Sequence, residues 1–245
     1  MVEYATDPSH NSRKSNDPKI AVFYSKGIAH PESLLSEFTT ALGNRGTIVG
    51  SFDLANMDTA WESKLQDVDF IALFPDGETQ NSARLDNAIK LIKSTTQPIL
   101  GSNTLYIQDV RSRVPEIAPC RLFIAVDWTP GQGDVDRNKI VTDTWGGDDN
   151  HRTALANDAA TALWEALKQV KGPDVAGNTP TSINMRELLT KISFIGMTGN
   201  VQFAPNGDRK EVPTTRTYVT IVPGQNPPYV SLKQVQSQSL CSNNL

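Results

Sequence analysis

The sequence predicts an α/β protein with an open, three-layer lobe built on a parallel sheet, plus a partial second lobe of helices and a β-hairpin. The first lobe is predicted because short apolar runs rich in β-forming residues alternate with segments of helical periodicity from residue 18 to residue 128. The second lobe is predicted by a change in composition. After residue 128 a Gly/Pro/Asp-rich connection leads to two helical stretches and a glycine-rich segment.

Five strands are expected in the first lobe. The intervening helices follow from apolar residues at helical spacing, such as Leu34, Leu35 and Phe38 after Pro31 at a first-turn position. Strands that alternate with helices indicate a parallel sheet with right-handed crossovers. The strands are expected at residues 19–25, 47–52, 68–74, 98–101 and 122–126.

The predicted domain organisation has five parts. They are a disordered leader at 1–17, the α/β lobe at 18–128, an interlobe connection at 129–151, partial first-lobe helices with terminal hairpin strands at 152–224, and a polar tail at 225–245. The first helix of the second half is expected at about 152–170, with its apolar residues at helical spacing: Leu155, Ala159, Leu163, Ala166 and Val170. Such helices need an apolar surface to cover, and the sequence does not obviously supply one.

The glycine-rich segment 194–210 predicts a hairpin near the interlobe region rather than a ligand loop. Val201 and Phe203 alternate as on a half-buried strand, and Asn206-Gly207 is a strong signal for a tight turn. We expect residues 217–222 to form the return strand. This segment is therefore interpreted as structural.

Composition excludes several functional classes. The chain has 245 residues, 38% hydrophobic and 20% charged, and its net charge is -4 with acids and bases intermixed, so no nucleic-acid partner is predicted. The longest apolar run, Phe70–Phe74, is far shorter than a membrane helix. The leader lacks the apolar core of a secretion signal. Cys120 and Cys241 show no metal spacing, and we leave open whether they are free or form one disulfide.

Motifs for cofactors and catalysis are missing from the sequence. There is no phosphate-binding glycine loop, and the loop after the first strand has one glycine where a dinucleotide fingerprint needs three. No nucleophile elbow is found, and residues 134–138 lack the glycine and glutamate of a calcium loop. Only the carboxylate pair Asp76 and Glu78 favours an enzyme. We therefore expect a non-enzymatic protein with no cofactor and no metal.

A binding site is expected at the carboxyl edge of the sheet, where ligands of open α/β sheets lie. The segments at this edge are 25–30, 75–80 and 102–106. Their polar side chains can hydrogen-bond a small zwitterion or amide, and Tyr106 can add an apolar wall. The residues concerned are Asp76, Glu78, Thr79, Asn103 and Tyr106.

Several stretches in a fixed order carry a family resemblance. They are "KIAVFYSKGIAHPESLLSEFTTAL", "DFIALFPDGETQNSARL", "PILGSNTLY", "HRTALANDAATALWEAL" and "FIGMTGNVQFAPNGDRK". Together they resemble the type I periplasmic binding proteins, specifically the branched-chain amino-acid and amide receptors of ABC transporters. The sequence departs from that family because most of the first lobe's sheet is missing, which accounts for helices without a surface to cover.

The resemblance implies a solute-binding or ligand-sensing module whose ligand lies in a cleft between two lobes. The positions that match the second-lobe half of this cleft are His30, Asp76, Gly77, Glu78, Thr79, Asn103 and Tyr106. It also implies a periplasmic or extracellular protein that serves a membrane permease. The alternative is a degenerate interaction or sensor domain of a larger signalling protein that no longer binds solute. In either case a homodimer is an expected way to cover the incomplete lobe.

Overall fold

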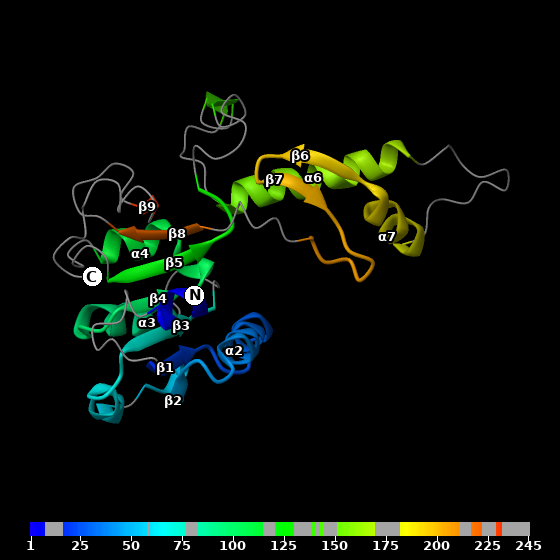
Figure 1. Cartoon of the computed structure of the whole chain (residues 1–245). Helices are drawn as coiled ribbons and strands as arrows, with labels where there is room; N and C mark the ends of the chain where they lie inside the picture. Colours follow the sequence, from blue (N-terminus) through cyan, green and yellow to red (C-terminus); the bar gives the residue numbers. More distant parts are fainter. Residues whose placement is uncertain are drawn as a thin grey trace. The chain divides into compact units, whose positions relative to one another are not determined.

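The structure is a computed structural model of the chain (Figure 1). It describes residues 1–7, 17–57, 59–76, 83–114, 121–129, 139–140, 143–144, 151–169, 182–210, 217–221 and 229–231. The chain divides into two compact units. The first unit is Met1–Val126 together with Tyr218–Leu245, and the second unit is Asp127–Thr217.

The first unit is built on a seven-stranded sheet with the order β2-β1-β3-β4-β5-β8-β9 (Figure 1). Neighbouring strands from β2 to β5 pair in parallel, whereas β8 and β9 pair antiparallel. The predicted parallel α/β fold class is thereby confirmed. The strands are β1 (Lys19–Tyr24), β2 (Thr47–Asp53), β3 (Phe70–Phe74), β4 (Ile99–Gly101), β5 (Leu122–Val126), β8 (Thr217–Ile221) and β9 (Tyr229–Ser231).

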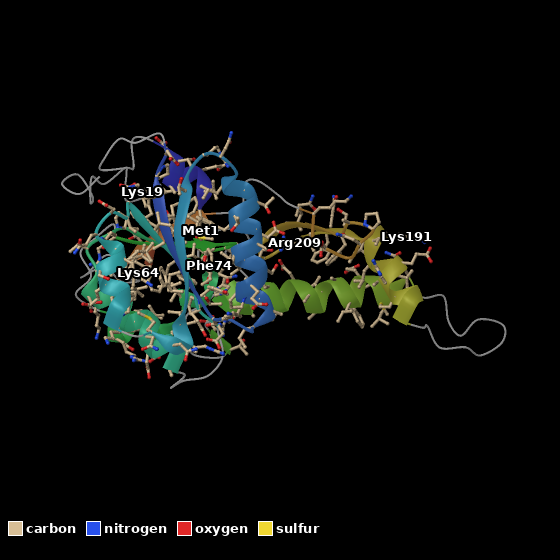
Figure 2. All side chains as sticks on the ribbon, turned by 90° about the horizontal axis from the view of Figure 1, so that it is seen from below. Met1, Lys19, Lys64, Phe74, Lys191 and Arg209 are labelled. Atoms are coloured by element: carbon tan, nitrogen blue, oxygen red, sulfur yellow. The ribbon has the colours of Figure 1, made fainter. Side chains whose placement is uncertain are left out.

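Helices cover both faces of this sheet, which gives three layers. On one face α3 (Ala83–Ser94) and α4 (Gln108–Arg113) pack on side chains such as Phe23 and Leu73. On the other face α1 (Val2–Thr6) and α2 (Ala29–Leu42) pack on side chains such as Phe74 (Figure 2). Three 3-10 helices, η1 (Leu54–Asn56), η2 (Thr59–Leu65) and η3 (Asn103–Leu105), complete the connections. Strands β1, β3, β4 and β5 are largely buried on both faces, as their nearly continuous apolar runs predict, whereas the edge strand β2 has only exposed and half-buried residues.

The prediction of a disordered leader is wrong for the first residues of the chain. Val2–Thr6 form helix α1, whose Val2, Tyr4 and Ala5 are buried against the sheet. The Tyr4 ring lies 4.5 Å from that of Phe123, measured between centroids. A segment with three buried side chains in five residues gains enough apolar burial to offset its ordering. The rest of the expected leader, 8–16, lies outside the described residues.

The named elements of the second unit, among the residues that the structure describes, are α6 (His151–Lys168), α7 (Ser182–Lys191), β6 (Ser193–Gly196) and β7 (Gly199–Gln202). Figure 1 shows β6 and β7 running along α6. β6 and β7 pair antiparallel around Met197 and Thr198, and a φ of 91° at Gly199 suits the glycine there. A hairpin and two helices are the predicted content of this part.

The prediction that residues 217–222 form the return strand of the hairpin is wrong. The Asn206-Gly207 turn does reverse the chain, with Gly207 at a φ of 96° and Phe203 bridging Arg209. The segment that returns is only the few residues around Arg209. Residues Thr217–Ile221 instead form β8 in the sheet of the first unit. Val219, Thr220 and Ile221 are all buried, so both faces of this strand need to be covered. The three-layer first unit provides this cover.

Helix α6 buries only part of the predicted apolar face: Ala166 is buried, whereas Ala159 and Leu163 are exposed and Val170 lies outside the described residues. Its buried residues include Ala154, Asp158, Ala162 and Ala166, whereas Leu163 is 48% exposed. The reason is steric, because small side chains allow α6 to approach the hairpin closely. A Cβ on Gly196 of β6 would overlap the carboxylate of Asp158.

Candidate functional site

The loops after β1 and β3 are joined by a buried serine and a buried aspartate. Ser25 follows β1, and its amide donates a hydrogen bond to the carbonyl of Phe74 at 3.1 Å. The Ser25 hydroxyl donates to Oδ1 of Asp76 at 3.0 Å and accepts from the Asp76 amide at 2.9 Å. Because β1 and β3 are neighbours in the sheet, this pair fixes the two loops at one edge.

Arg84, in the first turn of α3, completes this cluster. Its Nη1 donates to Oδ2 of Asp76 at 3.1 Å, and its Nη2 donates to the carbonyl of Lys26 at 3.3 Å. The Asp76 side chain is 5% exposed and that of Arg84 is 28% exposed. A buried carboxylate requires such a partner, since an unpaired buried charge is strongly destabilising. Sequence reasoning missed Arg84, although its position at the start of the next helix was a usable signal.

The loop after β4 lies beside the same edge. The amide of Ser102 donates to the carbonyl of Leu73 at 3.2 Å, and the hydroxyl of Thr104 donates to the carbonyl of Pro75 at 3.0 Å. The Ser102 and Thr104 hydroxyls also share a hydrogen bond. Three neighbouring loops are therefore tied together by short polar side chains. Ser25, Ser102 and Thr104 are all buried, so they hold the edge in shape.

The predicted site residues differ in their surroundings. Asp76 is buried, Asn103 is half-buried, and His30 is exposed in the first turn of α2. Tyr106 is 9% exposed and packs in the core under the α3 and α4 layer. The structure places Asp76 and Asn103 after the adjacent strands β3 and β4.

The remaining predicted positions, Gly77, Glu78 and Thr79, lie outside the described residues. A role in ligand binding stays a prediction for all seven positions. Cys120 and Cys241, and with them the question of a disulfide, also lie outside the described residues.

The chemistry available at this edge is hydrogen bonding and charge pairing. Both oxygens of Asp76 accept hydrogen bonds, from Ser25 and from Arg84, so this carboxylate is committed to the fold. Among the described residues no cluster of three or more His, Cys, Asp and Glu side chains has the arrangement of a metal site. Within the same part of the chain, no helix is both long and apolar enough to cross a membrane.

Comparison with known proteins identifies the fold. The sequence matches no protein-family model and is significantly similar to no curated protein. Solved structures do resemble it. A leucine-binding protein, LivK, from Thermotoga maritima has a TM-score of 0.68 at 16% identity, over 94% of this chain and 62% of that one.

Two further solved structures show the same likeness. The branched-chain amino-acid transporter substrate-binding protein LivJ from Streptococcus pneumoniae, in complex with isoleucine, has a TM-score of 0.62 at 15% identity, over 94% of this chain and 64% of that one. An ABC-transporter solute-binding protein from R. palustris, in complex with benzoate, has a TM-score of 0.63 at 15% identity, over 94% of this chain and 61% of that one.

The chain therefore has the fold of the type I periplasmic binding proteins, and the predicted resemblance is confirmed at the level of fold. It spans only about 61–64% of the length of these structures. Sequence identities of 15–16% show only that the fold is shared, and they do not identify a ligand for this chain.

Proposed function

We propose that the chain is a non-enzymatic solute-binding module for a small amino-acid-like or amide-like molecule. The single observation that carries this proposal is the convergence of the polar loops after β1, β3 and β4 at the carboxyl edge of the sheet, where open α/β folds bind ligands. The proposed binding residues are His30, Asp76, Gly77, Glu78, Thr79, Asn103 and Tyr106.

Proteins of the same fold support this ligand class. Solved neighbours are substrate-binding proteins in complex with leucine, isoleucine or benzoate, each of which carries a carboxylate. In this chain Arg84 brings a guanidinium to the same edge, in a fixed position beside Asp76. Arginine presents several N–H donors and suits carboxylate recognition. A receptor of this kind would act in the periplasm or outside the cell and deliver its solute to a membrane permease.

The proposal is tested by isothermal titration of the full chain with a panel of amino acids, amides, urea and benzoate. Asn103→Ala removes a half-buried amide after β4, and we expect it to weaken binding about fivefold, since one hydrogen bond contributes about 1 kcal/mol. Asn44→Ala is the matched control, because Asn44 is exposed just before β2, at the amino edge of the sheet. No heat and no thermal shift with any compound would exclude solute binding by this chain.

A second candidate is an interaction or sensor domain that has kept the fold and lost the solute. The observation that favours it is the commitment of Asp76 to Ser25 and Arg84, together with the burial of Tyr106 in the core. Two of the proposed ligand residues then serve the fold. If the titration panel gives no binding while Asp76→Asn lowers the unfolding midpoint, this second function is favoured over the first.

A further inference from the structure

Helix α6 carries a second apolar face that the described part of the chain leaves exposed. Its large members are Leu163, Trp164 and Leu167, with exposed fractions of 48%, 61% and 47%. Its small members are exposed alanines in the preceding turns. We call the six residues the α6 stripe: Ala156, Ala159, Ala160, Leu163, Trp164 and Leu167.

These six residues form one continuous surface. Their spacing of three and four residues places them along one side of an α-helix. No charged residue lies within the stripe. The opposite side of α6, with Ala162 and Ala166, already packs in a cluster with Ile192 and side chains of α7 and the hairpin. The helix therefore has two apolar faces, one packed within its own unit and one exposed and available to a partner.

The sizes of the stripe residues are arranged symmetrically about a point between Thr161 and Ala162. Each small residue lies as far before this point as a large residue lies after it. When two α6 helices pack antiparallel about a two-fold axis at that point, every alanine faces a bulky side chain of the other copy. The facing pairs are Ala156 with Leu167, Ala159 with Trp164, and Ala160 with Leu163.

We propose that the α6 stripe is the docking surface for a second copy of this chain. A two-fold interface requires a self-complementary patch, and the small-to-large pairing supplies this complementarity. Charge favours the same arrangement, because the positive N-terminal end of each helix dipole then lies beside the negative C-terminal end of the other. At the end of the helix Lys168 pairs with Glu165 at 2.6 Å, and its Nζ lies over the Trp164 ring, 5.7 Å from the ring centroid.

The size of the stripe sets the strength of the association. The stripe covers eleven residue steps, which corresponds to about 17 Å along a helix. A patch of this kind is on the order of 400 Å² per copy, the size of the largest apolar patch on a typical monomer. Two copies would bury about twice that area, below the range of about 1,200–2,000 Å² for stable complexes. We therefore expect a reversible dimer whose population rises with concentration.

The experiment is sedimentation velocity of the full chain over a hundredfold concentration range. Wild type is expected to shift from monomer to dimer. Trp164→Glu and Ala159→Arg should each raise the dissociation constant at least tenfold. The double variant with both changes should recover dimerisation, because each Arg then faces a Glu of the other copy. The proposal does not depend on the ligand site, so titration with solutes is not needed to decide it.

The controls test register and specificity. Ile195→Arg changes a residue of β6 that is 74% exposed and outside the stripe, and it should leave the dimer unchanged. Ala156→Arg combined with Trp164→Glu should not recover dimerisation, because these positions do not face each other. Far-ultraviolet circular dichroism checks that each variant is folded. A chain that stays monomeric at all concentrations, or a dimer weakened by Ile195→Arg and not by Trp164→Glu, would overturn the proposal.

Discussion

At the scale of single residues, Asp158 organises the second unit. Its carboxylate accepts hydrogen bonds from the amides of Met197 and Thr198, at 2.6 and 3.0 Å, and from the hydroxyl of Thr198. Arg209 adds a guanidinium whose Nη1 lies 3.8 Å from Oδ2 of Asp158, and its side chain lies beside the hairpin (Figure 2). The Asp158 side chain thus caps the β6–β7 turn. It can approach the turn closely because Gly196 has no side chain at the point of contact.

We expect Asp158→Ala to lower the free energy of unfolding by about 3 kcal/mol or more. The change leaves two buried amides of the turn without their acceptor, and each such group costs about 1–3 kcal/mol. The measurement is denaturant unfolding of the full chain. Asp158→Asn should be milder, because its one amide oxygen can still accept.

Glu165→Ala is the matched control for Asp158→Ala on the same helix. Glu165 forms only a surface ion pair with Lys168, so its loss should cost well under about 1 kcal/mol. Equal destabilisation by the two alanine variants would show that the buried hydrogen bonds of Asp158 do not stabilise this unit.

At the scale of elements, helix α1 is the clearest example of a segment stabilised by packing. Five residues are too few to form a stable helix alone. Tyr4 is nevertheless 6% exposed and packs among the rings of Phe70, Phe123 and Tyr218. The terminal ammonium of Met1 donates a hydrogen bond to the hydroxyl of Tyr218 in β8. The start of the chain therefore contacts the start of the first unit's second segment, Tyr218.

Tyr4→Ala is expected to cost about 3–5 kcal/mol, the usual range for removing a large buried aromatic side chain. Glu3→Ala, an exposed change in the same helix, should have little effect. Urea unfolding followed by tryptophan fluorescence would measure both. A Tyr4→Ala variant as stable as Glu3→Ala would mean that α1 does not pack on the sheet in solution.

At the scale of the whole molecule, stability should depend on pH through His151. This histidine is buried at the start of α6, and burial together with the charge of Arg152 lowers its pKa from 6.5 to about 4, with Asp127 opposing the shift. In the unfolded chain His151 binds a proton below about pH 6.5, whereas in the folded chain it binds one only below about pH 4. Stability from this group is complete above pH 6.5 and falls as pH decreases towards 4.

The size of this effect follows from the shift of the pKa. At about 1.4 kcal/mol per pH unit, His151 accounts for a loss of up to about 3 kcal/mol between pH 6.5 and pH 4. His151→Asn should flatten this part of the profile, measured as unfolding midpoint against pH. His30→Asn removes an exposed histidine and serves as the control. An unchanged profile in His151→Asn would contradict the assignment.

The sequence by itself determined the parallel α/β lobe. Runs such as Phe70–Phe74 and the helical spacing of Leu34, Leu35 and Phe38 are local patterns, and local periodicity is set by the geometry of strands and helices. It also predicts the carboxyl edge as the place for a site, because the loops that end there follow from the order of the strands.

Only the tertiary structure decided which residues complete each unit. Arg84 pairs with Asp76, Asp158 caps a turn about forty residues further on, and β8 joins the sheet beside β5, which ends at Val126. The same holds for α6, whose buried residues include three alanines while Leu163 and Leu167 remain exposed. The physical reason is that these contacts join distant segments, so they depend on packing between elements, which no pattern within one segment records.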